Sequence, residues 1–309
     1  MRTLQSLNRS INSAKSLESI VTTMKAHASS NIIQFQNAAK ASERYRVVLD
    51  KALYVVLSNK EASVPPPEKP SGVTLHIVFG SDHGLAGSFN ERISTFAQQE
   101  IPKGPEDQVI VIGQQVLMRI EDDFEISGIF PIPQSEDGIT PTVQRLLSRV
   151  EELREETGVR RALLYYNRPV EGSTFREEIE TLLPIDLEKL SGKEMTWDSR
   201  NLPITLMDPD VLLSDLLRQY FFITLYRTFC FSLVAENEAR IASMQSAEKN
   251  IKERIEELSF QYRLERQTQI TEEISDVISG FKAIRNRKDN PENEKPESGQ
   301  HRKKHLEEG

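Results

Sequence analysis

The sequence predicts a small α/β domain joined to a long antiparallel coiled coil, in which the N- and C-terminal helices pair. Two observations predict this fold. Both ends of the 309-residue chain lack helix-breaking residues over long stretches, and the middle alternates between strand and helix patterns. We therefore divide the chain into an N-terminal helix (1–64), a central α/β domain (65–209), a C-terminal helix (210–285) and a charged, disordered tail (286–309).

The two terminal helices are predicted from the positions of proline and glycine. All 15 prolines lie outside residues 1–64 and 210–290; the first stretch also lacks glycine, and the second contains only Gly280. Proline costs ~3 kcal/mol inside a helix and glycine ~1 kcal/mol relative to alanine. At a rise of 1.5 Å per residue, the helices would reach ~95 and ~120 Å, which is longer than a compact domain requires.

Apolar residues at spacings of three and four give each helix a seam for packing against another helix. The C-terminal seam consists of Leu213, Leu216, Tyr220, Ile223, Cys230, Val234, Ile241, Met244, Ile251, Ile255, Leu258 and Tyr262. The weaker N-terminal seam consists of Leu4, Leu7, Ile11, Ala14, Leu17, Val21, Met24, Ala28, Phe35 and Ala39. The C-terminal seam changes phase across Arg266 before it resumes at Ile270, which predicts a stutter and local unwinding.

The central section begins with a predicted stiff linker, PPPEKPS, at residues 65–71. Strand patterns follow at 73–79, 109–113 and 160–167, with a shorter one at 124–130, and helix patterns lie at 88–99, 114–121 and 140–157. Because strands alternate with helices, we expect a Rossmann-like domain with a mostly parallel sheet. Residues 170–209 give no clear pattern before a turn at Asp208-Pro209.

A glycine-bearing loop at residues 80–90 follows the first strand and opens a helix, which is where phosphate-binding loops lie. Its pattern matches neither common phosphate-binding motif, and no lysine is placed to reach a phosphate. We therefore interpret it as a structural turn of the α/β domain that depends on Asp82, Gly84, Gly87 and Asn90. Asp82 and Asn90 would bind backbone groups.

The remaining reactive residues do not favour an enzyme, and we expect no catalytic residue, no cofactor and no metal. Ser81, Asp82 and His83 are adjacent in sequence, so they cannot form the usual relay geometry. His301 and His305 have helical spacing but lie in the charged tail. The single cysteine, Cys230, lies on the apolar seam and is interpreted as a small core residue.

Composition also bounds the class of partner. The net charge of −8 gives no general attraction to nucleic acid or anionic lipid. No apolar run reaches the ~18 residues needed to span a bilayer, and the start lacks the apolar core of a signal peptide. We expect any membrane association to be peripheral and to come through a partner.

Polar side chains gather where the C-terminal seam changes phase, at Arg266, Gln267 and Thr271. They form either a solvated helix face or a set of hydrogen-bonding groups directed at a surrounding partner. Periodicity alone does not choose between these two interpretations.

Several motifs, in order from residue 1 to about residue 285, resemble the gamma subunit of F-type ATP synthases. The segments are LNRSINSAK (7–15), TMKA (23–26), SDHGLAGSFN (81–90), the stretch from Glu236 to Asn250 that contains RIASM, RQTQITEEI (266–274) and Gly280. The first two segments are similar to the family's opening helix and to the Met-Lys block that follows it. The segment 81–90 is similar to the family's S-D-x-G-L-x-G-x-x-N loop, and the stretch from Glu236 to Asn250 to its E-x-x-A-R-M-x-A-M segment. The segment 266–274 is similar to the family's R-Q-x-x-I-T-x-E-[IL] run, and Gly280 falls where the family has a glycine.

The chain also departs from the family pattern, which places it in a divergent or alternative branch. Ser29–Ile33 stands where the family has basic residues, Tyr262–Glu265 lacks a family asparagine, and Ser88 replaces a loop glycine. The tail after Arg285 is extra. No insert with paired cysteines is present, so thiol regulation is not expected.

The resemblance implies a rotor: the central-stalk subunit that couples ion-driven rotation of a c-ring to conformational change in catalytic beta subunits. The implied partners are the alpha, beta and epsilon subunits and the c-ring, at the cytoplasmic face of a bacterial inner membrane. The resemblance places Met24 and Lys25 near the moving beta lever, and Arg266, Gln267, Thr271 and Glu273 against the beta ring. The competing interpretations are a coiled-coil scaffold or adaptor and a nucleotide-binding enzyme.

Overall fold

The computed structural model describes residues 3–58, 72–104, 107–170, 173–186, 197 and 203–288. The chain divides into two compact units, which we describe separately: a sheet unit of residues 18–250 and an end unit of residues 1–17 together with 251–309. The predicted linker at 65–71 and the tail from residue 289 onward lie outside the described residues. The four-segment division of the chain remains a prediction.

Two long helices contribute residues to both units. α1 (Leu4–Ser58) has 55 residues, and α6 (Pro209–Lys288) has 80. Both predicted terminal helices are therefore present, and α6 continues three residues beyond the predicted end at 285. No described helix combines the length and the apolarity that crossing a membrane requires.

The sheet unit is built around five strands in the order β3-β2-β1-β4-β5. The strands are β1 (Val73–Phe79), β2 (Asp107–Ile112), β3 (Ile126–Phe130), β4 (Val159–Val170) and β5 (Ser173–Leu183). β1 pairs in parallel with β2 and β4, and β2 pairs in parallel with β3. The predicted parallel sheet and its four predicted strands are confirmed.

The fifth strand, β5, was not predicted, and it runs antiparallel to β4. Its sequence, STFREEIETLL, carries four charged residues within five positions. These charges are paired with neighbours: Arg168 Nη1 binds Glu178 Oε1 at 3.0 Å, and Arg227 Nη2 donates to Glu180 Oε1. Because ion pairs replace apolar contacts along this outer strand, it lacks the hydrophobic alternation that marks a half-buried strand.

One face of the sheet is covered by α2 (Phe89–Glu100) and α3 (Gln114–Ile120). Both follow parallel strands, as in the right-handed crossovers of α/β folds. The core on this side joins the two helices to β1, β2 and β4; its members include Ile93, Ala97, Val116, Ile120, Val78, Val109, Val111 and Tyr165.

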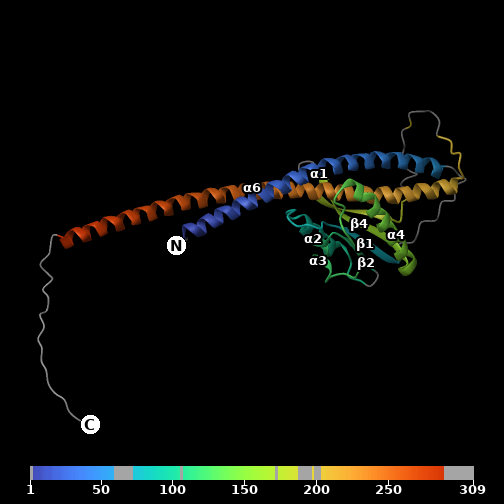
Figure 1. The fold of residues 1–309 in the computed structure, drawn as a ribbon. Helices are drawn as coiled ribbons and strands as arrows, with labels where there is room; N and C mark the ends of the chain where they lie inside the picture. The colour runs from blue at the N-terminus through green and yellow to red at the C-terminus, as the bar shows by residue number, and fades with distance from the viewer. Residues whose placement is uncertain are drawn as a thin grey trace, which may run out of the picture. The chain divides into compact units, whose positions relative to one another are not determined.

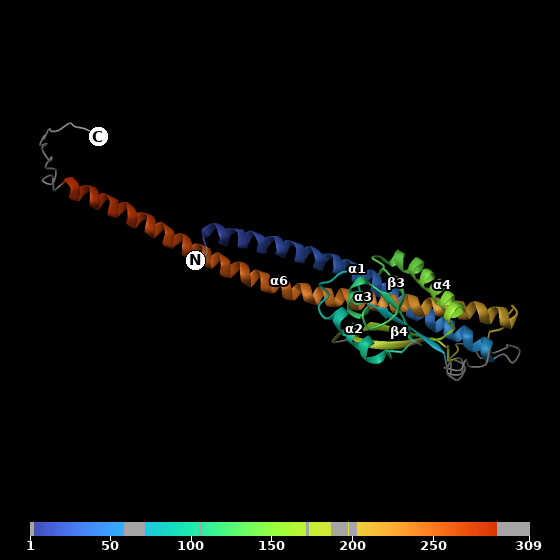
Figure 2. The ribbon, with the colours of Figure 1, turned by 90° about the horizontal axis from the view of Figure 1, so that it is seen from below.

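The other face is covered by α4 (Ile139–Thr157) together with α1 and α6. Figures 1 and 2 show α1 and α6 side by side along the sheet unit. They run antiparallel, because Lys25 binds Glu248 whereas Arg46 binds Tyr220. Apolar residues from both helices enter one core with the sheet; they include Phe35, Ala38, Leu225, Phe229, Cys230 and Leu233. Cys230 is fully buried there, and burial raises the pKa of its thiol to about 12.

In the end unit, the start of α1 packs against α6 through Leu7, Ile11 and Leu258, with Tyr262 partly buried beside them. From residue 266 to residue 285, every side chain of α6 is exposed. The helix continues unbroken through this stretch. The stutter and local unwinding expected near Arg266 remain a prediction. The apolar residues of this exposed segment (266–285) are Ile270, Ile274, Val277, Ile278, Phe281 and Ile284.

Candidate functional site

The β1–α2 loop, residues 80–88, is held in place by the Asp82 carboxylate. Asp82 Oδ1 accepts from the backbone N–H of Gln114 at 3.1 Å, and Oδ2 accepts from that of Ile132 at 3.0 Å. One side chain therefore ties the loop to the start of α3 and to the segment after β3. Both carboxylate oxygens bind neutral donors, so the negative charge of Asp82 is not cancelled by these contacts.

Asn90 holds the first part of the same loop. Its Oδ1 accepts from the backbone N–H of Ser81 at 3.0 Å, and its Nδ2 donates to Ser81 Oγ at 2.8 Å. Ser81 Oγ in turn donates to the carbonyl oxygen of His83 at 2.8 Å. The Ser81 hydroxyl is buried and bonded to the backbone, so it is not placed as a nucleophile beside the His83 ring.

The two predicted loop glycines differ in their surroundings. Gly87 has φ of 58°, the left-handed conformation that favours glycine. Gly84 is half-buried, and a Cβ there would meet only the side chain of Gln115, at 3.8 Å. The backbone therefore requires a glycine at 87 more strongly than at 84.

Helix α6 is joined to this loop by Glu236 and Arg240, two residues of the motif from Glu236 to Asn250. Arg240 Nη2 donates to Glu236 Oε1 at 2.6 Å and to the carbonyl oxygen of His83 at 3.4 Å. Glu236 is only 4% exposed. Burial raises the pKa of its carboxyl group to about 7, with Asp82 adding to the rise and Arg240 opposing it.

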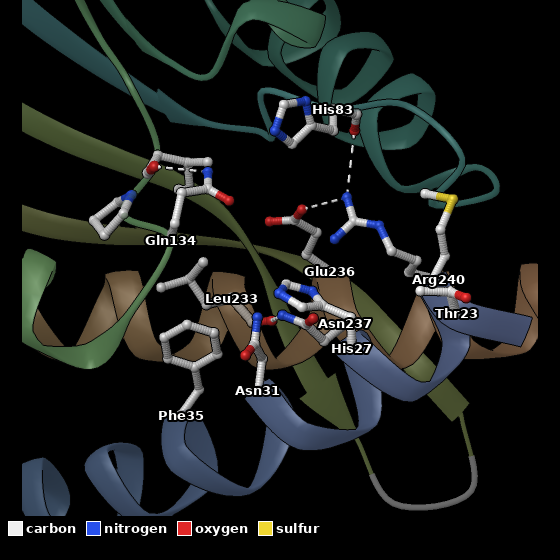
Figure 3. Close-up of a pocket in the computed structure, with 13 residues that line it drawn as sticks. Thr23, His27, Asn31, Phe35, His83, Gln134, Leu233, Glu236, Asn237 and Arg240 are labelled. Atoms are coloured by element: carbon white, nitrogen blue, oxygen red, sulfur yellow. Dashed lines mark hydrogen bonds and ion pairs between the residues drawn. The ribbon is translucent and has the colours of Figure 1, made fainter. Parts of the chain in front are cut away.

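A cavity of about 280 Å³ lies between this ion pair, α1 and the segment after β3. Figure 3 shows the Glu236 carboxylate directed into it, with His83 on one side and Gln134 opposite. We call this cavity the α1–α6 hollow. Its lining residues are Thr23, Met24, His27, Asn31, Phe35, His83, Ile132, Pro133, Gln134, Leu233, Glu236, Asn237 and Arg240.

Sequence reasoning did not single out this hollow as a site. It joins residues from four separate parts of the chain, and neither local spacing nor a motif brings these parts together. One signal was present: Glu236 and Arg240 have the i, i+4 spacing of a helical ion pair within a largely apolar stretch of sequence. That spacing identifies the pair but not the space beside it.

Met24 and Lys25, predicted to lie near the beta lever, both belong to α1 within the sheet unit. Met24 is half-buried and lines the α1–α6 hollow. The Lys25 ammonium donates to Glu248 Oε2, so it joins α1 to α6. A role for Lys25 toward another subunit would require that this pair open or be shared.

The four residues predicted to contact the beta ring all lie in the exposed segment of the end unit. Arg266, Gln267, Thr271 and Glu273 are exposed. Two hydrogen bonds run along the helix here: Thr271 Oγ1 donates to the carbonyl oxygen of Gln267 at 2.9 Å, and Gln269 Nε2 donates to Glu273 Oε1 at 3.1 Å. The assignments of all these residues remain predictions.

A metal site is also absent from the described residues. Across the described ranges, no group of three or more His, Cys, Asp or Glu side chains could hold a metal ion. The β1–α2 loop uses its carboxylate and amide groups to fix its own backbone. In the sheet unit, this loop is fixed by its own hydrogen bonds and lies against the pair of helices α1 and α6.

Comparison with known proteins identifies the family. The model of the ATP synthase family matches residues 3–284. The ATP synthase gamma chain of Anaeromyxobacter dehalogenans is 26% identical over 299 residues, covering 92% of this chain and all of the relative. The ATP synthase gamma chain of Macrococcus caseolyticus is 27% identical over 293 residues, with the same coverage.

Solved structures agree at the level of the fold. A chain in the cryo-EM structure of the Euglena gracilis mitochondrial ATP synthase, OSCP/F1/c-ring, matches with a TM-score of 0.64 and 16% identity, covering 98% of this chain and 99% of that one. A chain of the Tetrahymena thermophila mitochondrial ATP synthase central stalk/c-ring matches with a TM-score of 0.53, 18% identity, and coverage of 74% and 99%. The family match spans both long helices and the sheet between them, and we conclude that the chain belongs to the ATP synthase family, as a gamma chain.

Proposed function

We propose that this chain is the rotor of an F-type ATP synthase: the central-stalk subunit that couples ion-driven rotation of a c-ring to conformational change in the catalytic beta subunits. Its partners would be the alpha, beta and epsilon subunits and the c-ring. The chain itself would be non-catalytic. The observation that carries the proposal is the exposed segment of α6, taken together with membership of the family.

The exposed segment has the composition of a helix that fits inside a partner. Its apolar residues recur at spacings of three and four, and Ile274, Val277 and Phe281 are 55%, 59% and 73% exposed. A contiguous apolar stripe on a helix that no described residue covers marks an interaction surface. A ring of alpha and beta subunits would cover this stripe, with Arg266, Gln267, Thr271 and Glu273 supplying polar contacts.

The sheet unit is built to pass torque to the helices. α1 and α6 are packed into the same core as the sheet, and the Arg46 guanidinium stacks on the Tyr220 ring at 3.7 Å across the helix pair. Paired helices resist bending better than a single helix because each deformation must also disturb the packing between them. A force applied to the sheet would therefore reach the helix pair with little loss to local deformation.

In this proposal, Met24 and Lys25 lie near the moving lever of the beta subunit. Association with the membrane would be peripheral, through the c-ring, at the cytoplasmic face of a bacterial inner membrane. Fractionation of cells tests this placement. The chain should sediment with membranes and be released together with the alpha and beta subunits when the peripheral sector is stripped, whereas recovery in the unbound fraction would contradict it.

The decisive experiment is co-purification from cells through an affinity tag on the C-terminal tail, with mass identification of the recovered proteins. We expect alpha, beta and epsilon subunits together with ATPase activity. A double variant, Ile270→Ser with Ile274→Ser, should reduce recovery of alpha and beta, whereas Met118→Ser, at a side chain 55% exposed on α3, serves as the matched control. Recovery of the chain alone under conditions that preserve such complexes would favour a free-standing scaffold.

A further inference from the structure

The α1–α6 hollow presents unused hydrogen-bond acceptors. Arg240 occupies one oxygen of Glu236, and no group among the described residues donates to the other. Gln134 Nε2 donates to the carbonyl oxygen of Ile132 at 3.2 Å, which directs its amide oxygen away from the backbone. In Figure 3 the Gln134 side chain and the Glu236 carboxylate face each other across the open centre of the hollow.

The local charge is negative. Glu236 and Asp82 each contribute a carboxylate, and Arg240 is the single cation among the described residues that line the hollow. Asp82 binds only backbone N–H groups, so its charge adds to the field at Glu236. The imidazoles of His27 on α1 and His83 on the loop also line the hollow, together with the polar side chains of Thr23, Asn31 and Asn237.

One part of the wall is apolar. Phe35, Leu233 and Ile132 are buried and line the hollow. Figure 3 shows Phe35 and Leu233 on the side away from Arg240. An apolar pocket with a few convergent polar groups is the usual form of a small-molecule site. Its volume of about 280 Å³ lies at the small end of such sites, which restricts the ligand to a fragment-sized molecule.

We propose that the α1–α6 hollow binds a small organic cation that carries an amidinium, guanidinium or primary ammonium group on a short apolar body. The cationic N–H groups donate to the free Glu236 oxygen and to Gln134 Oε1, and the apolar body lies against Phe35 and Leu233. A metal ion fits this site less well, because no cluster of three acidic, histidine or cysteine ligands exists among the described residues. The proposal does not depend on the rotor function.

The binding energy has a clear electrostatic source. Burial disfavours the charged form of Glu236, so a bound cation that donates to its second carboxylate oxygen both forms a hydrogen bond and neutralises negative charge. A neutral molecule of the same shape supplies the hydrogen bond alone. Charge and shape can therefore be separated by comparing benzamidine with benzamide.

The test is calorimetric titration of the full 309-residue chain with benzamidine. We expect saturable one-site binding with a Kd of about 1 mM or tighter, and at least about tenfold weaker binding of benzamide. The benzamidine affinity should rise about tenfold between pH 6 and pH 8, because Glu236, with its pKa near 7, becomes ionised over this range. Absence of saturation at about 10 mM benzamidine, or equal affinity for benzamide, would overturn the proposal.

Three variants locate the site. Glu236→Gln keeps the shape of the side chain and should weaken benzamidine binding about tenfold or more while reducing the pH dependence. Gln134→Leu changes an exposed residue, so it tests the same hollow if Glu236→Gln fails to fold; we expect a loss of about threefold or more. Glu238→Gln, which removes the same charge from α6 outside the hollow, should leave the affinity unchanged. Equal effects of Glu236→Gln and Glu238→Gln would show that the cation responds to net charge alone and would refute the site.

Discussion

Two segments of one helix, α6, share a regular helical backbone but differ in burial and in how their apolar side chains are distributed. Residues 223–237, in the sheet unit, are almost all buried, with apolar side chains on every side of the helix. Residues 266–285, in the end unit, are exposed throughout and carry one apolar stripe among polar side chains. The first segment is enclosed by α1 and the sheet. An apolar stripe on a helix therefore predicts that something packs against it. It does not show whether that partner belongs to the same chain or to another one.

The largest expected effect comes from removing a ring in the buried segment. Phe229 is fully buried and packs edge-to-face on Phe79 with ring centroids 4.9 Å apart. Phe229→Ala should lower the free energy of unfolding by about 3–5 kcal/mol, measured by urea denaturation. The matched change Phe281→Ala, at a side chain 73% exposed, should alter it by about 0.5 kcal/mol or less. Similar losses at the two positions would contradict the proposed contrast.

The second expected effect is a pH dependence confined to the buried segment. The pKa of Glu236 is raised from 4.5 to about 7 in the folded chain, so the folded state binds more protons than the unfolded state between these values. Its contribution to stability is fully present below pH 4.5 and is lost as the pH rises to about 7, by on the order of 3 kcal/mol.

This contribution is measured as a difference between variants. The free energy of unfolding of the wild type minus that of Glu236→Gln should fall across this pH window and level off above about 7. Other groups cancel in the difference, including His76, whose pKa burial lowers and whose contribution is lost as the pH falls below 6.5. Glu273→Gln controls for the change in net charge. A difference that does not vary with pH would show that folding does not raise the pKa of Glu236.

The third expected effect concerns polar side chains in the same two units. Asn90→Ala removes one acceptor and one donor that fix Ser81 in the interior of the sheet unit. It leaves the buried Ser81 N–H without a partner, so we expect a loss of about 1–3 kcal/mol in the free energy of unfolding. Gln269→Ala removes a hydrogen bond in the exposed segment and should cost about 0.5 kcal/mol or less. Thermal unfolding of both variants distinguishes these outcomes.

The smallest effect on stability is expected where the functional effect should be large. Arg266→Ala combined with Gln267→Ala should change the unfolding free energy of the isolated chain by less than about 0.5 kcal/mol, because both side chains are exposed. In the assembled enzyme, the same variant should impair assembly or the coupling of ATP hydrolysis to ion movement. Normal assembly and normal coupling would remove these residues from the proposed contact surface.

The elements of this fold are largely predictable from sequence because each carries its own local pattern. Strand β1 is a short apolar run between turn signals, and the long helices follow from the absence of proline. Strand β5 was missed because Glu178 and Glu180 face arginines and not an apolar core. Its hydrophobic signal is therefore replaced by charge pairs that become visible only once β4 and α6 are placed beside it.

The candidate sites also differ in how far a local sequence pattern predicts them. The hydrogen bonds of Asp82 and Asn90 lie within or next to one loop, where residue type and turn chemistry are informative. The α1–α6 hollow joins His27, Gln134 and Glu236, which are about a hundred residues apart in sequence, so no local pattern contains it.

The core that joins α1, the sheet and α6 has a consequence for how the chain is made. Phe35 on α1 and Phe229 on α6 belong to one apolar cluster, yet 194 residues separate them (229 minus 35). At a synthesis rate of about 5–20 residues per second, this separation corresponds to a delay of roughly 10–40 s before the second half of the cluster leaves the ribosome. Contacts of such high sequence separation also slow folding itself. A nascent chain would therefore carry an uncovered apolar helix face for most of its synthesis, which makes it a natural client for a chaperone during translation.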